Sequence, residues 1–327
     1  CPTGRPDRPA LARALALEAA HVASRGPQGY GRAAELLDRT YGLAQRLESH
    51  HAMGVVEMSR AANAMLATHW REAAQRAEEA ERLLRERCSN VAWERATTLR
   101  FRIVALCYLG QLTELAELVP ERTADAERRG DLYARECARS GAASVAWLAM
   151  DRPEIARAQL EESRTLWSEQ GFQLQHYLML HGLTFVDLYE GHPEHALARL
   201  QQQWAAMEAS LLLRIYVLRL FMWTHRGTCA VAASRHADEP KKLLAIAERD
   251  ARRLEGQDAP VARAFGALVR AGITSRRGDD ERAVACLEDA ERQLDAVDMA
   301  LGAAAARHRR GELVGGDVLR ALPADDD

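Results

Sequence analysis

The stretch MDRPEIARAQLEESRTL (150–166) decides the fold, because it places a turn signal directly before an amphipathic helix. Asp151 is suited to cap the N-terminus of that helix, and Pro153 fits its first turn, where a missing N–H costs little. Behind them, apolar side chains recur at the spacing of a helix that packs on one side. These are Ile155, Ala158, Leu160, Leu166 and Trp167.

The same succession of turn and helix recurs along the chain. Turn signals that follow an apolar helix and precede an A..L...A helix occur at Gly29, His69, Gly110, Asp151, Gly191, Ala237 and Gly278. Subtracting successive positions gives steps of 40, 41, 41, 40, 46 and 41 residues. A near-constant step is the signature of a repeat array. The long step covers Trp204–His236, which we expect to run on as a longer helix or a loop.

The repeat predicts an all-α fold of the α-α superhelix class. We expect a right-handed solenoid of about seven helix pairs of the tetratricopeptide type, with a period of ~41 residues instead of the usual ~34. The first helix of a pair, such as Phe101–Leu109, is apolar on most sides, which is typical of a helix covered by two neighbours. Gly110, Gly191 and Gly278 are expected to end such helices in the left-handed conformation.

The repeats predict a single domain over residues 1–327. A leading helix over 8–24 and a trailing helix over 299–312 flank the pairs. Residues 1–10, CPTGRPDRPA, are polar, rich in proline and without a starting Met, so we expect a linker-like start to a fragment of a longer protein. The acidic segment 315–327 is expected to fray.

Composition narrows the classes of partner. A formal net charge of -3 gives no reason to expect a nucleic acid or an anionic membrane. The longest apolar run, Leu211–Trp223, is interrupted by Arg214 and Arg219, which argues against a spanning helix. No two of the six cysteines are close enough to form a CxxC pair, so we interpret them as small buried hydrophobes in a reducing cytoplasm.

The search for catalytic motifs favours a protein that is not an enzyme and takes no cofactor. The sequence holds no GxxxxGK[ST] phosphate loop, no HRD, DFG or VAIK kinase motif, and no HExxH or GxSxG. GPQGYGR (26–32) is rich in glycine but follows a helix, so we interpret it as a helix-helix turn. His192 and His195, with Glu194 between them, can bind a metal ion, and so can His176 and His181 if other residues help, but without a third ligand such spacing is unspecific. We expect no metal and an exposed polar cluster at 192–195.

Aromatic side chains with polar neighbours are the candidates for binding a partner. They gather in two places, near the start of an expected first helix and around the inter-repeat turn TLWSEQGFQLQHY (165–177). Such a set can form a ligand pocket or can be the packing that fixes the superhelix. Arg214 and Arg219 can hold a carboxylate in the groove, or can pair internally with Glu208 or Glu190. The candidate partner-binding residues are Trp93, Glu94, Trp167, Phe172, His176, Tyr177 and Arg214.

Short strings over most of the chain resemble a known family. They are RERCSNVAWE (85–94), CYLGQLTELAELVP (107–120), AERRGDLYA (126–134), WLAMDRPE (147–154), LWSEQGFQLQHY (166–177), DLYEG (187–191), SLLLRI (210–215) and RRGELVGGD (309–317). They resemble the C-terminal tetratricopeptide-like region of large bacterial serine/threonine protein kinases of the myxobacterial type, which carry a central signal-transduction ATPase. The chain departs from the family pattern at ALPADDD, where the family continues in another helix, which suggests truncation.

The resemblance implies a sensor or regulatory arm in a signalling protein. The parent would phosphorylate serine or threonine with ATP and Mg²⁺, but no kinase residue is present here to carry that activity over. A protein or peptide is the expected partner, held in the concave groove, and the parent's own kinase or ATPase domains are candidates. The alternatives are a free-standing adaptor, or the sensor arm of an ATPase-type transcription activator or of an antiviral defence protein.

Overall fold

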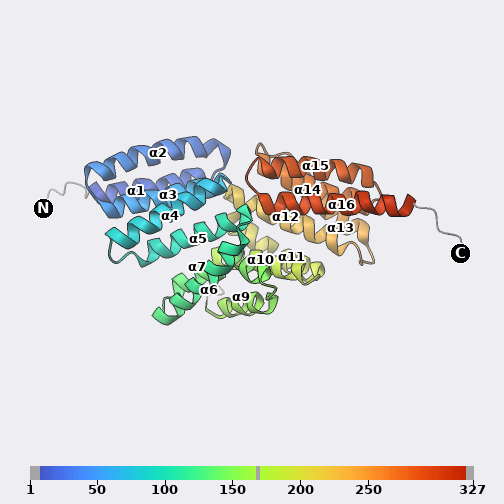
Figure 1. Cartoon of the computed structure of the whole chain (residues 1–327), viewed down its shortest axis with the longest axis horizontal. Helices are drawn as coiled ribbons and strands as arrows, with labels where there is room; N and C mark the ends of the chain where they lie inside the picture. Colours follow the sequence, from blue (N-terminus) through green and yellow to red (C-terminus); the bar gives the residue numbers. More distant parts are fainter. Residues whose placement is uncertain (1–7, 167–169, 322–327) are drawn as a thin grey trace. The chain divides into compact units, whose positions relative to one another are not determined.

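The computed structural model describes residues 8–166 and 170–321, which form helices joined by short turns (Figure 1). The helices follow one another as pairs. The first helices of the pairs are α1 (Arg8–Ala23), α3 (His50–Leu66), α5 (Ala92–Leu109), α7 (Leu132–Arg139) with η1 (Gly141–Ala143) and α8 (Ser144–Ala149), α10 (Leu174–Tyr189), α12 (Tyr216–Ala233) and α14 (Pro260–Arg276). The second helices are α2 (Pro27–Arg46), α4 (Trp70–Arg87), α6 (Leu112–Arg129), α9 (Pro153–Leu166), α11 (Pro193–Ala209), α13 (Pro240–Glu255) and α15 (Asp280–Asp295). The last pair is followed by α16 (Ala300–Ala321).

The predicted all-α helical repeat is confirmed. The second helices begin at residues 27, 70, 112, 153, 193, 240 and 280, so successive starts are 43, 42, 41, 40, 47 and 40 residues apart. The long step lies where it was predicted, because the short helix η2 (Leu212–Arg214) is inserted between α11 and α12. The handedness of the superhelix stays a prediction.

The turns follow the expected local chemistry. Gly110, Gly191 and Gly278 have φ angles of 76°, 79° and 80°, the left-handed conformation predicted for them. The side chain of Asp279 caps α15 by accepting a hydrogen bond from the backbone N–H of Arg282. Asp151 is the residue that the sequence predicts as the cap of α9. It adopts a φ of 57° inside the turn, and its carboxylate accepts the hydroxyl of Tyr189 at 2.6 Å.

Two boundaries differ from the sequence prediction. The string 26–32 was expected to be a turn, but α2 already begins at Pro27, whose fixed φ suits the first helical position. Gly29 is a packing glycine instead, since a Cβ there would lie 2.1 Å from the backbone oxygen of Val22. At the other end, α16 continues past the expected trailing helix to Ala321, so residues 315–321 are helical. The rest of the expected tail, 322–327, lies outside the described residues.

The helices group into two compact units. Unit 1 comprises residues 1–190 and 202–219, and unit 2 comprises residues 191–201 and 220–327. In unit 1, α3 packs against α1, α2, α4 and α5, and α5 packs in turn against α6 and α7. In unit 2, each helix from α13 to α16 packs against the next. The predicted single repeat domain stays a prediction.

The interior of unit 1 contains a line of aromatic and histidine side chains. Trp70 is fully buried and stacks on Tyr108, with ring centroids 4.7 Å apart. The Tyr108 hydroxyl lies 3.3 Å from Nε2 of His181, whose ring is 6.1 Å from that of Tyr177. Burial raises the pKa of both tyrosines well above the usual value, so their hydroxyls stay protonated. These side chains tie the second, third and fifth pairs together.

Ion pairs join a second helix to the helix that follows it. Glu81 of α4 pairs with Arg95 of α5 at 2.8 Å, and in unit 2 Glu255 of α13 pairs with Arg270 of α14 at 2.8 Å. A third example joins α15 to α16 through carboxylate and guanidinium groups 2.7 Å apart. Each of these three ion pairs thus joins two consecutive helices. A recurring contact between neighbours is expected of a repeat array, in which each unit is stabilised by the adjacent ones.

The apolar run 211–223 does not form one continuous helix. It is divided between η2 and the first half of α12. None of the described helices is long and apolar enough to cross a membrane.

Candidate binding site

A pocket of about 280 Å³ lies in unit 1 and is lined by α4, α5 and α6, by Ala134 of α7 and by the turn 88–91. We call it the arginine pocket. Its lining residues are Ala77, Glu81, Leu84, Arg85, Cys88, Asn90, Val91, Ala92, Arg95, Ala96, Thr98, Leu99, Arg102, Leu118, Arg122, Asp125, Arg129 and Ala134. Five of these are arginines and two are acids, so the lining carries a formal charge of 5 − 2 = +3.

The floor of the pocket is apolar. Leu84 of α4 is fully buried, and Leu118 of α6 is 7% exposed. Leu84 is held from below by α3, where a Cβ on Gly54 would lie 2.7 Å from its Cδ2 atom. The pocket therefore combines a rigid hydrocarbon base with a cationic wall, the usual composition of a site that binds an organic anion.

Helical spacing places the arginines on the pocket. Arg95 and Arg102 on α5 are seven residues apart, as are Arg122 and Arg129 on α6, so each pair of positions shares one helix face. Four of the five arginines are neutralised by a nearby carboxylate. These ion pairs are Arg85–Glu86 at 3.3 Å, Arg95–Glu81 at 2.8 Å, Arg102–Glu114 at 2.6 Å and Arg129–Asp125 at 3.0 Å.

Arg122 differs from the other four. Its Nε atom is buried and has no hydrogen-bond partner, and within the described part of the chain Arg122 forms no ion pair. Arg122 as a whole is half-buried, and the buried Nε has given up its hydration without gaining a hydrogen bond. The arrangement therefore leaves one positive charge of the pocket unsatisfied, at the middle of α6.

The turn at the pocket's edge provides no reactive thiolate. Asn90 adopts a φ of 56°, which lets the chain reverse between α4 and α5. Burial raises the pKa of the Cys88 thiol, and the charge of Glu94 raises it further. Cys88 is therefore a neutral thiol at neutral pH, and the chemistry of the arginine pocket is that of binding an anion.

Two of the predicted partner-binding residues lie beside this pocket. Trp93 and Glu94 belong to the first turn of α5, which also supplies Ala92 and Arg95 to the lining. The side chain of Trp93 is 48% exposed. Glu94 accepts a hydrogen bond of 2.8 Å from His51, so it is engaged with α3.

The predicted aromatic cluster is divided by the structure. The rings of Phe172 and His176 lie 5.6 Å apart, and Nδ1 of His176 accepts the backbone N–H of Gln173 at the start of α10. Tyr177 is buried, and its hydroxyl donates to the backbone oxygen of Leu218 at 3.1 Å. Tyr177 is therefore a core residue of unit 1, and Trp167 lies outside the described residues.

The structure also shows where the predicted arginines lie. Arg214 is exposed on η2, and Arg219 donates to the backbone oxygen of Leu213 at 2.9 Å. The two acids expected as internal partners are engaged elsewhere. Glu190 pairs with Arg157, and Glu208 accepts the indole N–H of Trp204 at 2.7 Å. Among the described residues, no hydrogen bond, ion pair or ring contact joins Arg214 to the other predicted binding residues.

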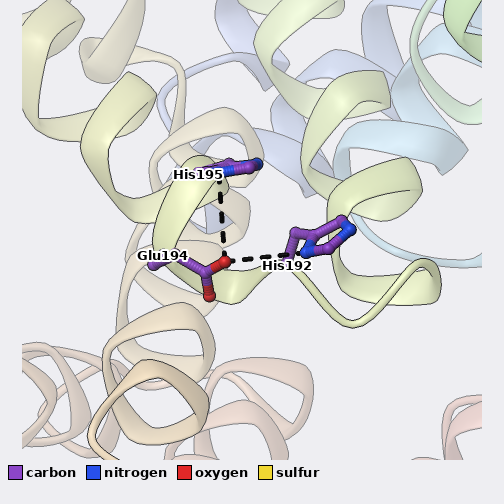
Figure 2. A group of neighbouring side chains, drawn as sticks. All are labelled: His192, Glu194 and His195. Carbon is purple, nitrogen blue, oxygen red and sulfur yellow. Dashed lines mark ion pairs between the residues drawn. The ribbon is translucent and has the colours of Figure 1, made fainter. Parts of the chain in front are cut away.

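The histidine cluster lies in the turn before α11 and in the first turn of that helix (Figure 2). Glu194 Oε1 is 3.6 Å from Nδ1 of His192 and 4.0 Å from Nε2 of His195, and the three side chains are at least half exposed. These three are the residues in the described ranges that come close enough to share a metal ion. The helix N-terminus, with its partial positive charge, disfavours a cation at this place. The other histidine pair does not converge, since His181 is in the core.

Comparison with known proteins adds no family to this description. No known family model matches the chain, and no curated protein matches it. The resemblance to kinase repeat regions therefore remains an expectation from the sequence strings.

The sequence contained a signal for the arginine pocket that motif searching does not use. Arginines seven residues apart on two consecutive helices, α5 and α6, mark faces that can point to one cavity. Their acidic neighbours made them resemble ordinary solvated faces. What the sequence could not show is that Arg122, alone of the five, receives no carboxylate.

Proposed function

We propose that this chain is a non-catalytic protein-interaction and sensor module, the regulatory helical-repeat arm of a multidomain bacterial serine/threonine protein kinase with an ATPase, acting in the cytoplasm. The observation that carries the proposal is the arginine pocket, a preformed binding site between three helices of a repeat array. Helical arrays present extended surfaces to proteins and peptides. The kinase context rests on the sequence resemblance.

A repeat array is also suited to regulation. Each pair contacts its neighbours, so a partner bound between α4 and α6 would bias the packing of both helices on α5. A ligand shifts such an equilibrium only by its difference in affinity for the two arrangements. A partner can contact the exposed Trp93 and the unpaired Arg122 in one arrangement of these helices and not in the other.

The proposal is tested with purified domains. The chain is immobilised, and the kinase and ATPase portions of the parent protein are passed over it in a biosensor, while phosphorylation by the kinase portion is measured with and without the chain. We expect one portion to bind and the rate of phosphorylation to change. Absence of binding to both portions, with an unchanged rate, would reject the regulatory arm and leave the free-standing adaptor.

A further inference from the structure

The arginine pocket has features that identify the chemistry of its occupant. It joins one uncompensated guanidinium to an apolar base, and it is small, at about 280 Å³. Sites for whole drug-sized ligands are about 300–1,000 Å³. The pocket thus has room for one side chain, and the remainder of a larger ligand must lie outside it.

The charge of the pocket favours a monoanion. Arg95 and Arg129 are matched to the two acids of the lining, and Arg85 and Arg102 are matched to acids just outside it. One positive charge, that of Arg122, is left over. A carboxylate neutralises it and fits the fork of a guanidinium. A dianionic phosphate would bring a second negative charge next to Glu81 and Asp125.

The surroundings of the pocket favour a peptide over a free acid. Two large apolar side chains near the lining in sequence are exposed. Trp93, which follows the lining residue Ala92, is 48% exposed, and Leu132, two residues before the lining residue Ala134, is 57% exposed. Tryptophan and arginine are, with tyrosine, the residues most enriched at interface hot spots. Apolar residues on both sides of an acidic one would cover these two side chains.

We propose that the arginine pocket binds the carboxylate of a glutamate or aspartate side chain in a partner protein, with Arg122 as its counter-charge and with flanking apolar residues of the partner resting on Trp93 and Leu132. This deepens the proposed function and rests on it. Arg122 is then a binding residue that has no counter-charge in the free chain and gains one in the complex.

The test uses the whole chain and the peptide acetyl-Ser-Ala-Leu-Glu-Leu-Ala-Ser-amide, whose glutamate is its only charge. We expect calorimetry to show binding that weakens with added salt, and about tenfold or more weaker binding of the peptide with Gln in place of Glu, because a charge-assisted contact is lost. Saturating peptide should also slow alkylation of Cys88, which lines the same pocket.

Arg122→Met should abolish binding of the Glu peptide without lowering the urea midpoint, because it removes a half-buried guanidinium whose buried Nε has no hydrogen-bond partner in the free chain. The matched control is Arg128→Met on the same helix, a residue that is 69% exposed and outside the lining. Arg128 pairs with Asp125 of the lining, but Asp125 keeps its ion pair with Arg129 at 3.0 Å, so this variant should bind as the wild type does. A structural Arg122 would instead give a lower midpoint. Normal binding by Arg122→Met, or equal binding of the Glu and Gln peptides, would overturn the proposal.

Two small anions distinguish the source of the charge. Butyrate, which has the stem and carboxylate of a glutamate side chain, should bind far more weakly than the peptide, and inorganic phosphate should not compete. Equal affinity for butyrate would make this a site for small acids and would overturn the peptide assignment, as would tighter binding of phosphate. If the kinase or ATPase portion binds the chain while the Glu peptide does not, this inference fails and the proposed function stands. If neither binds, both fail.

Discussion

The ion pair between Arg226 and Asp250 is the place where a single change in unit 2 should be most damaging. The guanidinium of Arg226 on α12 donates two hydrogen bonds of 2.7 Å to the two oxygens of Asp250 on α13. The two side chains are 9% and 0% exposed. Asp250→Asn keeps the volume but removes the charge, leaving a buried guanidinium without its full counter-charge.

We expect Asp250→Asn to lower the free energy of unfolding by about 3–5 kcal/mol, the cost of breaking a buried pair from one side. The matched control is Glu239→Gln, which removes a carboxylate that is 65% exposed and paired with Lys242, and it should cost about 1 kcal/mol or less. Replacing both partners, with Arg226→Met and Asp250→Leu together, should be less damaging than Asp250→Asn, because no charge is left buried.

The assay is urea unfolding followed by circular dichroism, with hydrogen exchange of the amides in α12, α13 and α14 to locate the loss. Exchange is needed because unit 1 and unit 2 need not unfold together, and a repeat array is not always two-state. Equal midpoints for Asp250→Asn and Glu239→Gln, or unchanged exchange in α12 to α14, would refute the reasoning that burial makes this pair costly to break.

Three further predictions use the same measurements. Leu160→Ala should lower the free energy of unfolding by about 2–5 kcal/mol because the side chain is fully buried, whereas Leu17→Ala, at a position 47% exposed, should change it by about 0.5 kcal/mol or less; equal losses would contradict the assigned core. Gly54→Ala should lower the free energy of unfolding, because its Cβ would lie 2.7 Å from Leu84. Gly31→Ala, with no neighbouring atom within 4 Å, should stabilise α2 by up to about 1 kcal/mol. A gain in stability at both sites would contradict the close packing of α3 on α4. Burial lowers the pKa of His225 to about 4 from 6.5. The unfolded chain therefore binds the proton more tightly than the folded chain. The contribution of neutral His225 to stability is full above about pH 6.5 and falls by up to about 3 kcal/mol as the pH drops through 4. His225→Gln should flatten this pH dependence in urea midpoints measured between about pH 7.5 and pH 5.

Much of the fold was readable from the sequence because its determinants are local. Gly110, Gly191 and Gly278 mark turns by a conformation that other residues adopt with strain, and the start of α9 at Pro153 follows from the fixed φ of proline. Gly29 was wrongly predicted to lie in a turn because it too is a glycine. Its glycine identity serves a close approach between α1 and α2, which is a tertiary contact and leaves no local pattern.

A break in the first helix of the fourth pair was also beyond the sequence prediction. α7 ends at Arg139, and Gly141 takes a φ of 64° before η1 and α8 resume the path. A Cβ on Gly182 of α10 would lie 3.2 Å from the backbone oxygen of Gly141, so the break lies where α10 comes close. That contact joins segments about one period apart.

The candidate site was predictable only in part. Trp93 and Glu94 were proposed from their position at the start of an apolar helix, and the first turn of α5 that holds them also supplies Ala92 and Arg95 to the arginine pocket, but their role in binding stays a prediction. The pocket itself depends on which arginines receive carboxylates from other helices. Sequence spacing shows that Glu81 and Asp125 are near arginines. That Nε of Arg122 has no hydrogen-bond partner depends on how the helices pack, which the spacing does not show.

The long step between α11 and α13 has a consequence for how such arrays change length. Starts of the second helices are 47 residues apart here and 40 apart on either side, so seven extra residues are absorbed in the stretch that holds η2, and the next pair resumes the usual spacing. At Gly191 and Gly278 a side chain would meet open space. The turns are thus the points at which genes for such arrays can gain residues, or lose a whole pair, while the helices on each side keep their partners.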